Sequence, residues 1–344
     1  MKTMIVWFTT TMALLASPAH AEDGAPTVPQ FEVDAFWPKP LPNKWILGQV
    51  SGIATDRYDR IWVVHRRASL TLRERAAEQN PPEAKCCVAA PPVLVFDQSG
   101  NLLRHWGGAG EGFQWPQSEH GIFIDNNDFV WLAGNGKNDG QLLKFTMDGK
   151  FVLQIGKQGE GNDSNSTTRL GSPADVAVDV AAKEVFAADG YANRRVVVFD
   201  SETGHYKRHW GAYGKPPSDE KTPPYDPAKP PSQQFGNPVH CIRVDKDDLV
   251  YVCDRSNNRL QVFRKDGTFV AEHVYEKATR GTGSVYDLVF SPDQDQKRFG
   301  RPGRQIGQFT ALHDIAVDRQ GNIFTSEVNT GQRVQKFRRI DRQN

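Results

Sequence analysis

One short pattern recurs along this chain and restricts its fold more than any other feature. The pattern is an apolar stretch that ends in Asp, a polar turn, a second apolar stretch, and a further turn into a third. It is clearest over residues 240–263 and recurs over 174–199 and 120–145. The stretches alternate apolar with polar residues and the turns are rich in Asp, Asn and Gly, as in antiparallel β-structure. A repeat of this kind indicates a repeat architecture.

The number of repeats predicts the fold. The position that begins each repeat is occupied by Ser51, His120, Ala174, His240, Tyr286 and His313. Six repeats of about four strands predict an all-β fold, a six-bladed propeller of the kind built from such repeats. The last repeat lacks its outer strand, and residues 31–36 are expected to supply it and close the ring. An open β-sandwich is the alternative, but sandwiches do not repeat their motif.

One repeat is shorter than the others. Tyr286 and His313 are only 27 positions apart, whereas the other intervals are 46 to 69 positions. Residues 285–290 predict a good first strand, but two middle strands are missing between Asp295 and Phe299. We therefore expect a truncated fifth blade, whose neighbours lose part of the surface that they would bury.

The composition is that of a folded domain. Of the 344 residues, 38% are hydrophobic and 10% are aromatic, which excludes global disorder. The formal net charge of +1 gives no basis for a nucleic-acid partner or for attachment to a membrane surface. We expect a monomer.

The N-terminus predicts export. Lys2, an apolar run over residues 4–16 and the small residues Ala19 and Ala21 form the pattern of a cleaved signal peptide. We expect a signal peptide over 1–21 and a single mature domain over 22–344, secreted or periplasmic. An uncleaved anchor is the alternative. No later stretch is long enough to span a bilayer.

The four cysteines do not form a disulfide scaffold or a zinc motif. Cys86 and Cys87 are adjacent in a proline-rich stretch, and no C-x-x-C spacing occurs. Cys241 and Cys253 lie on two neighbouring predicted strands of one hairpin, where an oxidising compartment would allow them to pair.

Three of the six repeat-starting positions are histidines. First strands of propeller blades line the central channel, and alternate blades lie about 120° apart in a six-membered ring. The imidazoles of His120, His240 and His313 are therefore expected to converge on the axis as an open three-histidine zinc site. The alternative is that they are ordinary polar residues that line the channel.

A second set of positions follows the second strand of each repeat. Arg66 and Arg255 share one such position, and Tyr191 comes just after the residue that occupies it in the third repeat. Two guanidinium groups beside a cation favour an anionic ligand, most simply a carboxylate. Each arginine taken alone would more often be a surface residue.

Asp314 follows His313 and is expected to point to the other side of its strand. Together with the main-chain carbonyls of Ile53 and Ile122, its carboxylate would suit a hard cation such as Ca²⁺. A plain hydrogen-bonded Asp is the alternative.

With these residues in place, the chain resembles the peptidyl-α-hydroxyglycine α-amidating lyases, six-bladed propellers of NHL-type repeats. The resemblance runs from about Gly48 to Phe337, and its specific stretches include 48–53, 175–179 and 189–191. It departs from the family at Ala311 and Leu312, where the family has a methionine, and at Ala192, where relatives often have a cysteine.

The resemblance implies a role for each site residue. The family's zinc ligands correspond to His120, His240 and His313, and its substrate-contacting arginines correspond to Arg66 and Arg255. Its proposed catalytic base corresponds to Tyr191 and its structural calcium carboxylate to Asp314. The implied reaction cleaves an α-hydroxyglycine amide into an amide and glyoxylate. Zinc would polarise the hydroxyl oxygen, Tyr191 would accept its proton, and the arginines would anchor the carboxylate of a small substrate.

Two other functions compete with this zinc lyase. One is a non-catalytic propeller that binds a protein or a small molecule at its rim. The other is a lactonase-like hydrolase, which we disfavour because such metal sites are built from acidic and amide oxygens.

Overall fold

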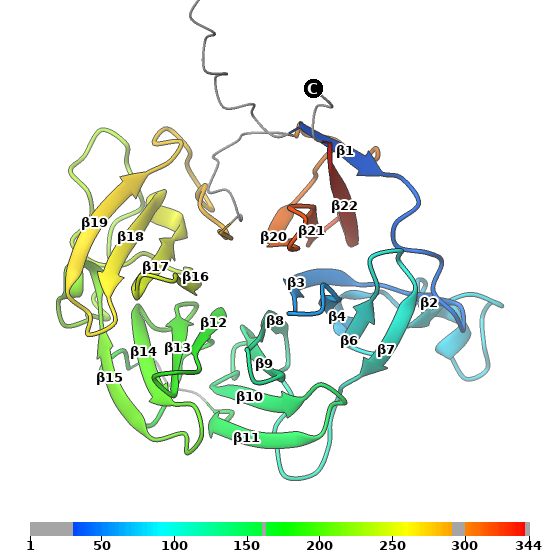
Figure 1. The fold of residues 1–344 in the computed structure, drawn as a ribbon, viewed down its shortest axis with the longest axis horizontal. Coiled ribbons are helices and arrows are strands. Elements are labelled where there is room, and N and C mark those ends of the chain that lie inside the picture. Colours follow the sequence, from blue (N-terminus) through cyan, green and yellow to red (C-terminus); the bar gives the residue numbers. More distant parts are fainter. Residues whose placement is uncertain (1–29, 160–162, 291–299, 341–344) are drawn as a thin grey trace, which may run out of the picture.

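The computed structural model describes residues 30–159, 163–290 and 300–340. In these residues, five four-stranded antiparallel sheets stand around a central axis, with their first strands innermost (Figure 1). The protein is therefore an all-β propeller, as the repeats predict. The predicted signal peptide lies outside the described residues. Within the described part of the chain, no helix has the length and apolar character needed to cross a membrane.

The sheets follow one another along the chain. The first consists of β3 (Gln49–Thr55), β4 (Ile61–Arg66), β6 (Val93–Phe96) and β7 (Leu102–Trp106). The second consists of β8 (Glu119–Ile124), β9 (Phe129–Gly134), β10 (Gln141–Thr146) and β11 (Phe151–Gly156). The third consists of β12 (Asp175–Asp179), β13 (Glu184–Asp189), β14 (Arg195–Asp200) and β15 (Tyr206–Trp210). The fourth consists of β16 (Val239–Val244), β17 (Leu249–Asp254), β18 (Arg259–Arg264) and β19 (Phe269–Val274).

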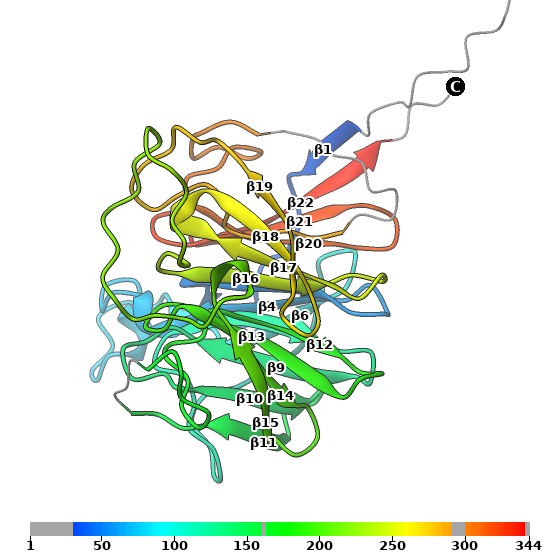
Figure 2. The same cartoon turned by 90° about the vertical axis from the view of Figure 1, so that its left-hand side faces the viewer.

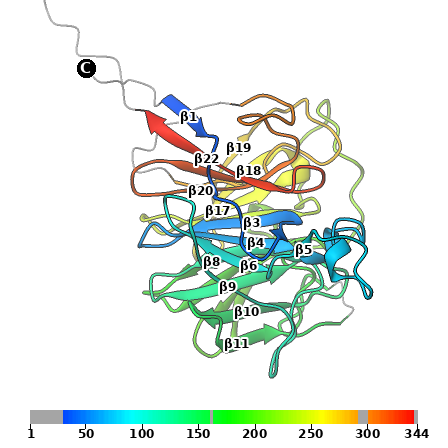
Figure 3. The same ribbon diagram turned by 90° about the vertical axis from the view of Figure 1, so that its right-hand side faces the viewer.

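The last sheet joins the two ends of the described chain. It consists of β20 (Leu312–Val317), β21 (Ile323–Glu327), β22 (Arg333–Ile340) and β1 (Gln30–Asp34). Strand β1 pairs antiparallel with β22, with Phe31 opposite Arg339 and Val33 opposite Phe337, and the two strands lie side by side in both side views (Figures 2 and 3). The prediction that residues 31–36 complete the last sheet is confirmed for Phe31 to Asp34.

The remaining elements are short. They are β2 (Trp45–Ile46), which pairs in parallel with β5 (Val88–Ala89), and four 3-10 turns: η1 (Arg67–Ser69), η2 (Ala76–Glu78), η3 (Ala212–Gly214) and η4 (Arg255–Asn257).

The aspartate that ends each first strand explains the repeat. The Asp125 carboxylate accepts the backbone N–H groups of Asn127 and Phe129, which fixes the turn between β8 and β9. Its second oxygen accepts the indole N–H of Trp131 at 2.9 Å. Asp56 and Trp62 make the same contact in the first sheet, at 2.8 Å. The repeated Asp is therefore a turn-forming residue, and in the first two sheets it also satisfies a buried tryptophan.

The hydrophobic core lies between neighbouring sheets. Buried side chains of the first sheet, such as Trp62 and Val95, pack against Ile122, Val130 and Leu143 of the second. Each sheet therefore depends on its neighbours for burial, as expected of stacked repeats.

The segment between β19 and β20 does not have the structure predicted for it. Residues 275–290 and 300–311, which we call the truncated sector, lie between β19 and β20 and contain no strand among the described residues (Figure 1). The prediction of a strand over 285–290 is therefore wrong. A strand needs a hydrogen-bonded neighbour, and the described part of this sector supplies none. The proposed gap between Asp295 and Phe299 lies outside the described residues.

Residues 285–290 nevertheless hold the place of an inner strand. The carbonyl oxygen of Tyr286 accepts a hydrogen bond from His240 on β16, and the Asp287 carboxylate accepts the amide of Ile315 on β20. Residues 285–290 thus connect β16 to β20 at the inner edge of the ring, although the described part of this sector contains no outer strand.

Both cysteine pairs are bonded. The predicted pairing of Cys241 with Cys253 is confirmed, and it joins β16 to β17. Cys86 and Cys87, the adjacent pair, form the second disulfide.

Candidate metal centre

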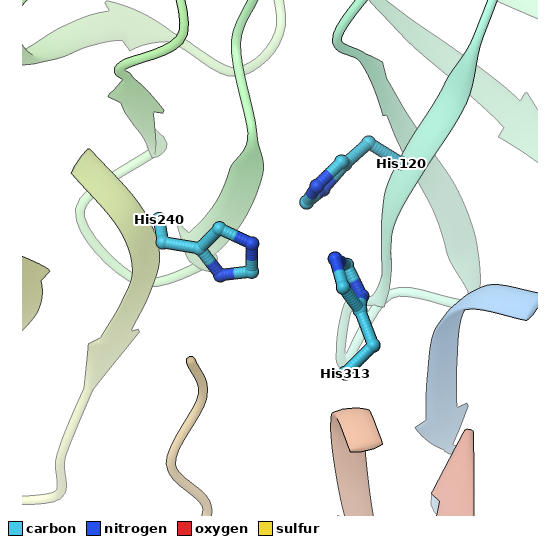
Figure 4. Close-up of side chains that lie close together, drawn as sticks. All are labelled: His120, His240 and His313. Carbon is cyan, nitrogen blue, oxygen red and sulfur yellow. The ribbon is translucent and has the colours of Figure 1, made fainter. Parts of the chain in front are cut away.

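Three histidines from three different sheets meet at the axis of the ring. His120 lies on β8, His240 on β16 and His313 on β20, and all three are buried (Figure 4). Their candidate ligand atoms lie within 4.8 Å of one another, and their ring centroids are 4.7 to 4.9 Å apart. The equal repeat positions of these residues therefore become a single cluster in space.

A backbone carbonyl orients each imidazole. The Nδ1 atoms of His120, His240 and His313 lie 2.7, 2.5 and 2.9 Å from the carbonyl oxygens of Ala174, Tyr286 and Ser51. Because a carbonyl oxygen can only accept, Nδ1 carries the proton in each ring and Nε2 keeps its lone pair. This is the arrangement in which a second hydrogen bond fixes the tautomer of a metal-binding histidine.

Burial keeps the three rings neutral. It is the largest cause that lowers the pKa of His120 and of His240 well below the usual value, and the other imidazoles and nearby arginines lower it further. Burial and the Arg66 guanidinium lower the pKa of His313 to about 3. Each ring therefore offers an unprotonated nitrogen at neutral pH, which metal binding requires.

The three rings are suited to a divalent metal. The buried Nε2 atom of His240 has no hydrogen-bond partner among the described residues, which is costly unless a ligand binds it. Three neutral imidazole donors suit a borderline metal such as Zn²⁺, and such a site leaves a fourth position for water or substrate.

Tyr191 and Arg255 lie beside the histidines. The Tyr191 hydroxyl lies 3.0 Å from Nε2 of His120, to which it donates, and it accepts a hydrogen bond from Nη1 of Arg255 at 3.2 Å. Tyr191 follows β13 and Arg255 begins η4 after β17, so two neighbouring sheets supply them. The buried Nε of Arg255 has no partner among the described residues.

Arg66 is near the cluster but is already engaged. Its Nε donates to the carbonyl oxygen of Glu119, the residue before His120, and its two terminal nitrogens donate to Gln49 and Asn135. Arg255 is therefore the less engaged of the two arginines.

The three imidazoles line a small pocket that is partly open to solvent. Ser51, Ala174 and Tyr286 also line it. A pocket of this kind is far smaller than the volume that a drug-sized ligand fills.

Asp314 meets Ile53 through the backbone amide. The N–H of Ile53 donates to Oδ2 of Asp314 at 3.0 Å, and Nη2 of Arg243 lies 3.8 Å from Oδ1. Ile122 lies on β8, which packs against the β3 strand that carries Ile53. The calcium site of Asp314, Ile53 and Ile122 stays a prediction, and the cation that the structure places near Asp314 is a guanidinium.

A charged cluster that was not predicted from the repeats lies next to the histidines. Arg243 on β16 pairs with Asp175 and Asp287, and Asp314 lies beside them. A signal was available, because Asp175, Asp287 and Asp314 occupy the same repeat position, directly after Ala174, Tyr286 and His313.

Fold and site together define a β-propeller with a buried three-histidine centre. Parts of the sequence are similar to known proteins. The NHL repeat family matches residues 239–263. The chain is 27% identical over 237 residues to the peptidylglycine alpha-amidating monooxygenase of Rattus norvegicus, covering 65% of this chain and 22% of that protein. It is 27% identical over 225 residues to a probable peptidyl-alpha-hydroxyglycine alpha-amidating lyase of Caenorhabditis elegans, covering 64% of this chain and 57% of that protein.

The name of a further relative refers to no enzymatic activity. The chain is 25% identical over 246 residues to NHL repeat-containing protein 3 of Mus musculus, covering 69% of this chain and 58% of that protein. The chain thus spans between about a fifth and three fifths of these relatives. It carries an NHL repeat and is distantly related to the amidating proteins, so the predicted resemblance is confirmed.

Solved structures resemble the chain loosely. A streptogramin B lyase aligns with a TM-score of 0.48 at 11% identity, over 91% of this chain and 98% of that one. The virginiamycin B lyase of Staphylococcus aureus aligns with a TM-score of 0.47 at 10% identity, over 89% of this chain and 88% of that one. At these TM-scores the overlap supports no inference about activity.

Proposed function

We propose that this protein is a zinc-dependent lyase that cleaves the C–N bond of an α-hydroxyglycine-type amide into an amide and glyoxylate. The observation that carries the proposal is the convergence of three imidazoles, each with Nδ1 tied to a backbone carbonyl, beside a tyrosine and an arginine. The distant similarity to amidating proteins supports the same reaction.

The reaction needs a proton to move from oxygen to nitrogen. The hydroxyl proton leaves, the C–N bond breaks with its electron pair on nitrogen, the nitrogen takes up a proton, and the former hydroxyl carbon becomes the aldehyde of glyoxylate. A zinc ion held by His120, His240 and His313 would supply Lewis-acid polarisation of the hydroxyl oxygen.

Tyr191 would move that proton. Nε2 of His120 cannot accept the Tyr191 hydroxyl and bind a metal at once. In the metal-loaded protein the hydroxyl therefore loses this partner and keeps Arg255, whose positive charge stabilises the oxygen when it is deprotonated. Tyr191 would accept the substrate's hydroxyl proton from this position.

Arg255 would bind the substrate carboxylate. Its unpartnered Nε requires an acceptor, and a carboxylate accepts from a guanidinium edge with two parallel hydrogen bonds. Arg66 adds positive charge from the other side of the cluster while its own nitrogens stay engaged. A fixed carboxylate keeps the hydroxyl near the histidines, which lowers the entropic cost of reaction.

Metal content and glyoxylate release test the proposal. We expect about one zinc per purified chain, and loss of that zinc in His120→Ala. The loaded protein should release glyoxylate from α-hydroxyhippurate, and Tyr191→Phe should retain zinc but lose this activity. A folded wild-type protein that binds no zinc when zinc is supplied would contradict the proposal.

The second candidate is a non-catalytic scaffold that binds a protein or a small molecule. The similarity to NHL repeat-containing protein 3 favours it. Zinc binding without glyoxylate release would support this second function.

We further propose that the ring is six-membered, that the truncated sector is the remnant of its fifth blade, and that the protein acts as a monomer after export to a secreted or periplasmic location. The inner-edge hydrogen bonds of Tyr286 and Asp287 support the first point, and the two disulfides support export.

A further inference from the structure

We propose that Tyr286, in the truncated sector, is a positioning residue that holds Arg255 for carboxylate binding. This inference rests on the proposed function, since it names a further residue of the same site. Tyr286 occupies the repeat position of the three histidines and lies between two of them, with its ring centroid 5.4 Å from that of His240 and 6.1 Å from that of His313.

The Tyr286 ring supports the Arg255 guanidinium from one side. The Arg255 Cζ lies 4.7 Å from the centroid of Tyr286 and 5.7 Å from that of Tyr191. Cation–π contacts act on the face of the guanidinium and leave its edge available for hydrogen bonds. The Tyr286 hydroxyl donates to the side-chain oxygen of Thr282 at 2.8 Å, which fixes the ring from its far end.

The orientation leaves one donor that needs a ligand. Nη1 of Arg255 donates to Tyr191, whereas Nε is buried and has no partner in the part of the chain that the structure describes. An unpaired buried N–H is costly, so the site is built for an acceptor from outside the chain. Tyr286 thus acts at two points: its carbonyl sets the tautomer of His240, and its ring sets the plane of Arg255.

Carboxylate binding tests this role without turnover. Glyoxylate is titrated calorimetrically into zinc-loaded wild type, Tyr286→Leu and Tyr286→Phe, with Tyr275→Leu as a matched control because Tyr275 is exposed in the same sector. We expect binding to weaken about five- to tenfold in Tyr286→Leu only, with zinc content unchanged, because only that variant removes the ring beside Arg255. Unchanged binding in Tyr286→Leu, loss of its zinc, or equal weakening in Tyr286→Phe would overturn the role.

The test separates this role from the lyase itself. Wild type that binds glyoxylate with the expected variant pattern but releases none from α-hydroxyhippurate would refute the lyase and leave the positioning role intact. If the wild type releases glyoxylate and Tyr286→Leu has an unaltered affinity and KM, the lyase is supported and the positioning role of Tyr286 is refuted.

An independent cluster leads to a second inference. We infer that the Arg243 guanidinium is the built-in cation of the ring and takes the place that a calcium ion would fill beside Asp314. Arg243 lies on β16, pairs through Nη1 with Asp175 of β12 and donates through Nη2 to Asp287 of the truncated sector at 2.9 Å. Nη2 also lies 3.8 Å from Asp314 of β20.

The three carboxylates are joined to the ring as well as to Arg243. Asp175 accepts the amide of Ile242, Asp287 that of Ile315, and Asp314 that of Ile53. Each carboxylate therefore connects its own sector to a neighbouring sector of the ring. A positive group among these buried acidic side chains offsets part of their negative charge, and an arginine supplies it permanently because its guanidinium does not deprotonate in proteins.

Thermal unfolding of the zinc-loaded protein with and without millimolar CaCl2 tests this inference. We expect calcium to leave the wild-type Tm unchanged, and Arg243→Ala to lower it by about 10 °C, because three buried carboxylates lose their cation. Arg243→Lys keeps the positive charge but not the planar guanidinium, so its Tm should lie between those of the wild type and Arg243→Ala. A wild-type Tm that rises with calcium, or an Arg243→Ala protein as stable as wild type, would overturn the inference.

Discussion

The sheet β12–β15 and the truncated sector present the same kinds of polar group at the inner edge of the ring. They differ in the strands that lie outside that edge. Each presents a backbone carbonyl to a histidine, Ala174 to His120 and Tyr286 to His240. Each also presents a carboxylate to Arg243, from Asp175 and Asp287. The sheet adds four hydrogen-bonded strands and a buried core, whereas the described part of the truncated sector has no strand.

The comparison separates two tasks that a propeller blade performs. The inner edge supplies the groups that orient the site, and a segment of a few residues is enough for that task. The outer strands supply packing that stabilises the sector. A segment with no strand among its described residues can therefore still support the histidine next to it.

The first and largest expected effect tests whether both sectors support their histidines equally. His120→Ala and His240→Ala should each lose the bound zinc and lower glyoxylate release by about a thousandfold or more, because two imidazoles do not complete the site. Zinc analysis and a glyoxylate assay measure this, with the exposed His273→Ala as control. If His240→Ala kept its zinc, the two sectors would not be equivalent.

The second expected effect concerns an ion pair inside one complete sheet. Arg195 on β14 pairs with Asp189 on β13 at 2.8 Å, and both side chains are fully buried. Arg195→Met leaves a buried carboxylate without its partner and should lower the free energy of unfolding by about 3–5 kcal/mol. Urea unfolding measures this.

The control for that prediction is an exposed pair. Arg57→Ala, which removes the exposed ion pair with Asp128, should cost less than about 1 kcal/mol. Equal effects at the two sites would argue against burial as the cause.

The third expected effect is a dependence on pH from the first sheet. His65 accepts the Gly48 amide and donates to the Pro91 carbonyl, and burial lowers its pKa to about 4. In the unfolded chain the imidazole of His65 has a pKa of about 6.5, so it becomes protonated there before it does in the folded protein. Stability is therefore lost as pH falls from about 6.5 to about 4. The loss should total about 3 kcal/mol.

A variant without this titrating group isolates its contribution. His65→Gln should show a shallower fall in the free energy of unfolding over the same pH range, measured by urea unfolding at each pH. Parallel curves for the variant and the wild type would refute the assignment to His65.

The smallest expected effect compares packing in the two sectors directly. Val197 on β14 is fully buried in a large cluster, whereas Val285 belongs to the small cluster around Cys241 and Cys253. Val197→Ala should cost about 2–3 kcal/mol and Val285→Ala about 1 kcal/mol, because the smaller cluster relaxes more readily around the lost methyl groups. An equal or reversed order in urea unfolding would show that the truncated sector is packed like a complete one.

Much of the fold and site could be predicted because repeats convert sequence position into spatial position. His120, His240 and His313 are far apart in sequence but share one repeat position, and the ring brings them together. The closing strand at Phe31 could be predicted because the last repeat lacked its outer partner.

The errors arise where the repeat is interrupted. The alternation over residues 285–290 predicts a strand, but a strand also needs a neighbour, and alternation does not report on neighbours. Arg243 was missed for a related reason. Its partner Asp287 comes from the interrupted repeat, and a buried ion cluster depends on how three sectors meet rather than on any one stretch of sequence.

The pairing of β1 with β22 has a consequence for when the three histidines could bind a metal. One sheet contains both ends of the described chain, and the three histidines come from widely separated parts of it. The ring cannot close until the last strand has been synthesised, so the ligands assemble late and together. The compartment in which folding finishes would then decide which ion the protein takes up.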